Sequence, residues 1–150
     1  MQRWIVIGVV AMILAMGGAV AGYRVIKQNR PSPIWVPMPV NPELPGDKRD
    51  EIRKELKGKL KERGLLGNVV KDLGLAKAWG LASDEAAIDE LSRRVFVDSG
   101  ETITPTGPVP TFNIGVTGKV KEKEVSEKIA MRLMDDVWKI LGIDPPPRED

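Results

Sequence analysis

An uncharged apolar segment runs from Trp4 to Gly22, and the rest of the chain is polar and charged. The segment is about 19 residues long, and as a helix it would measure roughly 28 Å, close to the thickness of bilayer hydrocarbon. It ends in the small-x-small sequence Ala19–Ala21, so two interpretations stay open: a membrane anchor over residues 1–23, or a signal peptide cleaved after Ala21. We expect the anchor, because this apolar core starts closer to the N-terminus than most signal cores do.

Composition excludes several classes of function. The chain has 150 residues, a net charge of +2, no cysteine and no histidine. A charge this small gives no electrostatic basis for binding nucleic acid. Without His or Cys, the chain cannot form a Ser-His-Asp or Cys-His catalytic site or a His- or thiolate-ligated zinc site. It also contains no GxxxxGK[ST] phosphate-binding loop. We expect a protein that is not an enzyme, with no catalytic residue, cofactor site or metal site; an enzyme would need carboxylates that the fold brings together.

A basic stalk, residues 24–33, leads from the apolar segment to a stretch in which apolar residues alternate with prolines. This stretch is Ile34–Val40, and its prolines are Pro37 and Pro39. Proline has no backbone N–H, and residues two apart in a strand present that group to the same edge. The stretch is therefore either an edge strand with one blocked edge or a polyproline II segment.

Four segments repeat apolar residues at helical spacing. Ser83 suits an N-cap, and its helix buries Ala87, Ile88 and Leu91. The last helix has an apolar stripe that we expect in the core, formed by Val125, Ile129, Leu133 and Val137. The four predicted helices are Asp47–Arg63 with Asp47 as its cap, Leu65–Leu73, the helix capped by Ser83, and Val125–Leu141.

Two strands are predicted late in the chain, Val95–Asp98 and Thr111–Thr117. The loop between them, Glu101–Pro110, could bind a partner or accept a sugar, and we expect it to connect an antiparallel hairpin. The last helix would cover one face of this small sheet, which also takes up the earlier edge strand. The predicted fold class is α+β, with an N-terminal transmembrane helix, a domain over residues 34–142 and a Pro-rich tail over residues 143–150.

The middle and end of the chain resemble the polysaccharide chain length determinant (Wzz-like) family. The resemblance begins with Gly64–Leu75 followed by Trp79-Gly80, which match a family helix of the form "vl.pVi..LgL...wg". The segments that continue the pattern are an acidic helix and strand at Ser83–Val97, a strand at Thr111–Val116, and a helix at Val125–Trp138.

This resemblance implies a function in the biosynthesis or export of a surface polysaccharide, either lipopolysaccharide or exopolysaccharide. It implies a single-pass protein of the inner membrane whose C-terminal domain faces the periplasm. Its partners would be the membrane, copies of itself or the export machinery, and the polysaccharide, but no nucleic acid. The family's long helical hairpin and second membrane helix have no counterpart in the sequence, so we expect the chain to correspond to the membrane-proximal base of the family.

An alternative is an exported, signal-cleaved periplasmic module that binds a glycan or a peptide. It would use the loop Glu101–Pro110 together with Trp35, Trp79 and Trp138, since aromatic faces can stack on sugar rings. Core packing is the default expectation for tryptophans in amphipathic patterns. Asp135 and Asp136 diverge by about 100° on a helix and are not expected to form a catalytic carboxylate pair.

Overall fold

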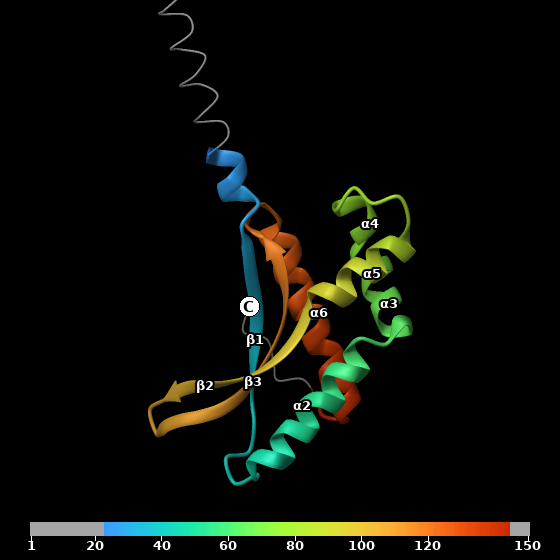
Figure 1. Ribbon diagram of the computed structural model, residues 1–150. Coiled ribbons are helices and arrows are strands. Elements are labelled where there is room, and N and C mark those ends of the chain that lie inside the picture. The colour runs from blue at the N-terminus through green and yellow to red at the C-terminus, as the bar shows by residue number, and fades with distance from the viewer. Residues whose placement is uncertain (1–22, 145–150) are drawn as a thin grey trace, which may run out of the picture.

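The computed structural model describes residues 23–144 and has the predicted α+β arrangement (Figure 1). A three-stranded antiparallel sheet has the order β1-β3-β2, with β1 at Pro31–Pro39, β2 at Val95–Thr104 and β3 at Gly107–Lys119. Residues 23–28 are helical and lead into β1. The helices after β1 are α2 (Gly46–Leu60), α3 (Arg63–Leu73), α4 (Leu75–Ala78), α5 (Asp84–Arg94), the 3-10 turn η1 (Val120–Glu122) and α6 (Lys123–Leu141).

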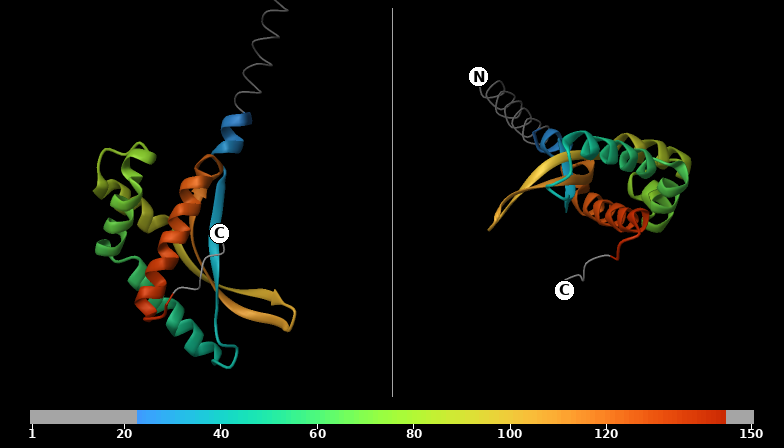
Figure 2. Two further views of the ribbon diagram at one scale, coloured as in Figure 1. Left: turned by 180° about the vertical axis from the view of Figure 1, so that it is seen from behind. Right: turned by 90° about the horizontal axis from the view of Figure 1, so that it is seen from below.

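The core lies between one face of the sheet and the helices. Figure 2 shows α6 lying along β1 and β3, with α3, α4 and α5 forming a lobe beside α6 and away from the β2–β3 hairpin. Ile129, Leu133 and Val137 of α6 are fully buried, and Val125 packs against the same core, so the predicted stripe is confirmed. The sheet contributes the inward-facing residues Phe112, Ile114, Val116, Val95 and Val97.

Strand β1 is an edge strand, which decides between the two interpretations of the Pro-rich stretch. The Val40 N–H donates to the Pro110 carbonyl at 2.9 Å, so the even-numbered residues of β1 turn their backbone groups toward β3. The odd-numbered residues turn theirs away. These odd positions include four prolines, Pro31, Pro33, Pro37 and Pro39.

The helix ends follow the local sequence, with one exception. The Ser83 hydroxyl accepts the Ala86 N–H at 3.2 Å, which confirms the predicted cap. Gly74 and Gly142 end α3 and α6 with φ of +59° and +66°, a conformation that glycine adopts without steric cost. The predicted Asp47 cap is wrong, because Pro45 occupies the cap position and Asp47 lies inside the first turn of α2.

The segment Glu101–Pro110 is not a loop. β2 continues to Thr104 and β3 begins at Gly107, so the strands form a long hairpin with only two residues between them. The two prolines of this segment, Pro108 and Pro110, are even-numbered residues of β3 and point their nitrogen atoms away from β2. They therefore leave the hydrogen-bond ladder between β2 and β3 intact. The loop prediction was wrong because it took these prolines as strand breakers.

The predicted transmembrane helix and the single-pass inner-membrane location need correction. Over residues 23–144, no helix is long and apolar enough to cross a membrane. The longest of them, α6, has a single apolar stripe and carries charged residues such as Glu127 and Lys128 elsewhere on its surface. The predicted anchor segment, Trp4–Gly22, lies outside the described residues.

Candidate functional site

The strongest candidate site is the face of the sheet opposite the helices, which we call the open face. It is formed by the odd-numbered residues of β1 and β3 and the even-numbered residues of β2. Its central row is Trp35, Gly115 and Phe96, directly opposite one another across the three strands. Trp35 is 48% exposed and Phe96 is half-buried, so this row presents aromatic surface to solvent.

Gly115 brings the strands of this row close together. A Cβ atom at this position would lie 2.7 Å from the Cα and Cβ atoms of Trp35, and closer still to the Ile34 carbonyl oxygen. Atoms of a well-packed structure do not approach so closely, so only glycine fits here. As a result, no side chain stands between Trp35 and Phe96 in the row.

Polar groups form the neighbouring row of the open face. Asn113 lies between Pro37 on β1 and Asp98 on β2. The Thr111 hydroxyl donates to the Asn113 Oδ1 atom at 3.3 Å. A Cβ at Gly100 would lie 2.5 Å from the Asn113 Nδ2 atom, so the amide of Asn113 extends over Gly100. The open face therefore places an amide and a carboxylate about 7 Å along the strands from its aromatic row.

The other two tryptophans considered for sugar stacking are part of the body of the domain. Trp79 and Trp138 are half-buried and pack against the core. The ring of Trp79 also has the Arg94 guanidinium 4.5 Å from its centroid. Of the three, Trp35 presents the most accessible ring, and it lies on β1.

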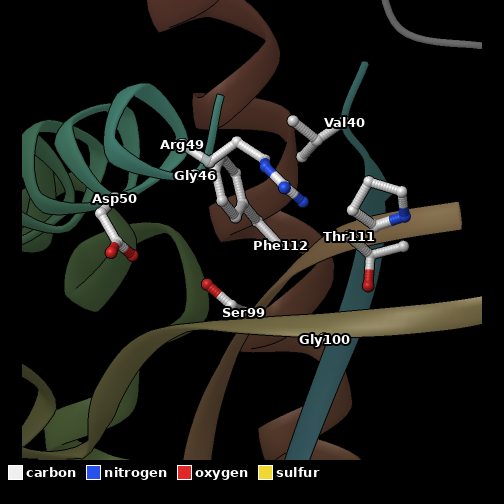
Figure 3. A pocket seen from close by; sticks show the side chains of 9 residues that line it. Val40, Gly46, Arg49, Asp50, Ser99, Gly100, Thr111 and Phe112 are labelled. Carbon is white, nitrogen blue, oxygen red and sulfur yellow. The ribbon is translucent and has the colours of Figure 1, made fainter. Parts of the chain in front are cut away.

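A second feature is a cavity of about 160 Å³ at the start of α2, which we call the α2 pocket (Figure 3). Gly46 and Arg49 of α2 line it, together with Ser99 of β2 and Phe112 of β3. The Arg49 Nε atom is buried and has no hydrogen-bond partner. Asp50 also lines the pocket. The pocket thus places a guanidinium and a carboxylate where the start of α2 meets β2 and β3.

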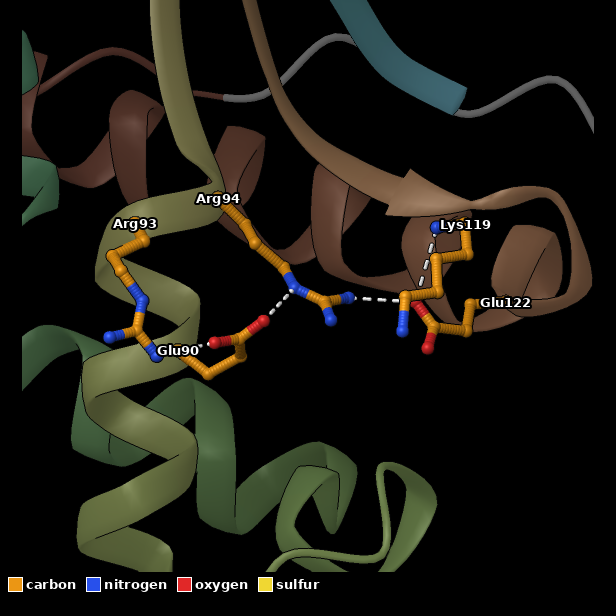
Figure 4. Close-up of polar contacts among 5 residues, drawn as sticks. All are labelled: Glu90, Arg93, Arg94, Lys119 and Glu122. Carbon is orange, nitrogen blue, oxygen red and sulfur yellow. Dashed lines mark hydrogen bonds and ion pairs between the residues drawn. The ribbon is translucent and has the colours of Figure 1, made fainter. Parts of the chain in front are cut away.

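A network of charged groups joins α5 to the turn after β3 (Figure 4). Arg94 donates to Glu122 and to Glu90, each at 2.7 Å, and Glu122 also accepts the Lys119 N–H at 3.1 Å. Hydrogen bonds from Arg93 and then Arg94 lower the pKa of Glu90. Burial lowers the pKa of Arg94, but its bonds to Glu122 and Glu90 outweigh that effect and raise it. Arg94 thus joins Glu90 of α5 to Glu122 of the turn by two ion pairs, which suits a structural clamp.

Asp136 is likewise engaged in a structural contact. It is buried and accepts from Arg132 at 2.5 Å, and Arg132 also binds Asp72 of α3 at 2.9 Å. This arginine therefore links α6 to α3. Within residues 23–144, no group of three or more acidic, His or Cys side chains is arranged to hold a metal ion.

No protein-family model, no curated protein and no solved structure matches this chain. The resemblance to chain length determinants therefore stays a prediction drawn from the residues.

Sequence reasoning missed the Arg94 clamp and the α2 pocket, because both join residues far apart in the chain. The sequence contains a partial indication of the Arg94 clamp, because Arg94 is a charged residue directly before a buried strand.

Proposed function

We propose that this chain is a non-enzymatic protein of surface polysaccharide biosynthesis or export, and that its open face binds the glycan. The observation that carries the proposal is Trp35, which is 48% exposed at the centre of an exposed sheet face. Together with the half-buried Phe96 in the same row, Trp35 forms an exposed aromatic patch, and such a patch favours a contact with a partner.

The chemistry of the open face suits a sugar chain. Aromatic rings stack on the apolar C–H faces of pyranose rings, and Trp35 and Phe96 supply two such surfaces in one row. Asn113 and Asp98 supply an amide and a carboxylate in the next row, where they can bond sugar hydroxyls. The order of elements, an edge strand, helices, a hairpin and a final helix, is also the order that the resemblance implies.

Binding of the purified full-length chain to surface polysaccharide from its source cells tests the role of Trp35. We expect Trp35→Ala to weaken binding about tenfold, because a stacked aromatic contact contributes roughly 1.4 kcal/mol. Met131→Ala is the matched control, since Met131 is an exposed apolar residue of α6, away from the open face. Equal binding by wild type and Trp35→Ala would refute the site.

The cellular role is tested by deleting the gene and separating the surface polysaccharide on a gel. We expect a changed amount or length distribution that wild type restores and Trp35→Ala restores less well. An unchanged polysaccharide in the deletion strain would overturn the proposed function itself.

A further inference from the structure

The two edges of the sheet are built differently. On the outer edge of β1, four of the five outward-facing positions are proline, and only Trp35 has an N–H to offer another strand. Proline on an edge prevents further strand pairing, because each missing donor removes one ladder hydrogen bond. The β1 edge is therefore closed.

The edge of β2 is open. The even-numbered residues of β2 face β3, so the backbone groups of Val97, Ser99, Glu101 and Ile103 point outward. None of these residues is proline. Figure 1 shows the ends of β2 and β3 projecting from the body of the domain. Ile103, near the tip, is 88% exposed.

We propose that two copies of this chain pair antiparallel through their β2 edges, around a two-fold axis at Gly100. A chain with one usable edge can pair only once, so the product is a closed dimer. Two usable edges would instead give an open-ended polymer, which the prolines of β1 prevent.

Charge limits the register of this pairing. With the axis at Gly100, Glu101 of each copy lies opposite Ser99 of the other, and Asp98 lies opposite Thr102. Val97 then lies opposite Ile103. An axis at Glu101 would place two carboxylates directly opposite each other, which is destabilising.

The α2 pocket complements this register. Directly opposite residues in a sheet point to the same face, so Glu101 of the second copy points to the face on which Ser99 lines the pocket. Arg49, with its buried and unpaired Nε atom, lies in that pocket. The pocket's own acid, Asp50, is paired with Arg53 at 3.3 Å. The pocket therefore offers a cation to an incoming carboxylate, and the second copy supplies one.

Disulfide trapping tests the register, and the chain is suited to it because it has no cysteine. In the proposed register the Asp98 residues of the two copies lie four residues apart along the paired strands, about 13 Å, too far for a disulfide, and the same holds for the two Thr102 residues. We expect an equal mixture of Asp98→Cys and Thr102→Cys chains to form a disulfide dimer, and neither variant to do so alone. Mixing either with Pro33→Cys, on the closed edge, is the control and should give none. The proposal would be overturned if the Asp98→Cys and Thr102→Cys mixture gave no disulfide dimer, or if a mixture with Pro33→Cys gave as much.

Charge reversal tests the Arg49 contact. Sedimentation of the full-length chain in mild detergent should give twice the 16.5 kDa of one chain. We expect Glu101→Lys to raise the dimer dissociation constant at least tenfold, and Arg49→Glu combined with Glu101→Lys to restore dimerisation. Glu101 is exposed, so the far-UV circular dichroism spectrum of Glu101→Lys should match that of wild type, which shows that the fold is retained. A wild-type monomer at tens of micromolar, or an assembly that Glu101→Lys leaves unchanged, would refute the pairing.

Discussion

Replacing Arg94 with methionine should destabilise the domain more than any other single charge removal on α5. The Arg94 side chain is 13% exposed and that of Glu122 is 14% exposed, and the pair is 2.7 Å apart. Methionine keeps most of the aliphatic length of the side chain but removes the guanidinium, and with it the contact with the Trp79 ring. The variant therefore removes the charge, its hydrogen bonds and the cation–π contact together, while keeping an apolar stem of similar length.

The magnitude follows from what Arg94→Met leaves behind. Glu122 keeps the Lys119 N–H but loses its counter-charge while remaining largely shielded from water. Removing one partner of a shielded ion pair costs about 3 kcal/mol. For a chain of 150 residues, this corresponds to a fall in Tm of roughly 6–12 °C. Arg93, the neighbouring residue, has a side chain that is 73% exposed, and Arg93→Met should cost under about 1 kcal/mol.

The assay is thermal unfolding of the full-length chain followed by far-UV circular dichroism, with a double-mutant cycle. Glu122→Gln removes the charge on the other side and keeps the shape of the side chain. We expect the variant with both changes to lose about 2 kcal/mol less than the sum of the two single variants, because each single change already breaks the same contact. Additive losses, or an Arg94→Met variant no less stable than Arg93→Met, would refute the clamp.

Three further changes test other parts of the fold. Gly115→Ala should lower stability by about 1–3 kcal/mol or prevent folding, because its Cβ would meet Trp35, and urea unfolding measures the loss. Arg93 and Arg94 lower the pKa of Glu90, so the stability that ionised Glu90 contributes is present above its unfolded pKa and is lost as the pH falls through its folded pKa. Glu90→Gln should therefore flatten the fall in Tm on acidification. A fall in Tm identical to that of wild type would contradict this. Replacing Pro33 and Pro37 with threonine should restore outward-pointing N–H donors on β1 and cause concentration-dependent aggregation, measured by light scattering. A variant that stays as dispersed as wild type would count against the closed edge.

Local patterns predicted the elements that have a strong period or an unambiguous end. The stripe of α6 from Val125 to Val137 sits in the core because its spacing matches the helical repeat. The cap at Ser83 and the glycine ends depend on a few neighbouring residues, so the sequence alone determines them. The edge position of β1 was also predictable, since proline at alternate positions leaves few other places in a sheet.

The site could not be predicted in the same way, because it depends on register. Trp35, Gly115 and Phe96 form one row only after three strands separated by long stretches of chain are aligned. The antiparallel hairpin of β2 and β3 was predicted correctly, but the length of its strands was not, for a related reason. Prolines that would interrupt a central strand are harmless when their nitrogen atoms point away from the partner strand. The direction of those atoms is known only once the pairing is known.

The proposed glycan site lies on one face of the sheet and the proposed dimer interface runs along its β2 edge, which makes their combination testable. Residues opposite each other in a sheet point to the same side, so pairing through β2 places both open faces on one side of a continuous sheet. A long glycan could then contact Trp35 of both copies, and binding would gain from avidity, whereas a short oligosaccharide would contact one copy. We therefore expect Glu101→Lys to weaken binding of long polysaccharide tenfold or more and to leave binding of a short fragment unchanged, with both measured by calorimetry. Trp35→Ala should weaken both and leave the dimer intact. If Glu101→Lys dissociated the dimer and left both affinities unchanged, the two open faces would not act together.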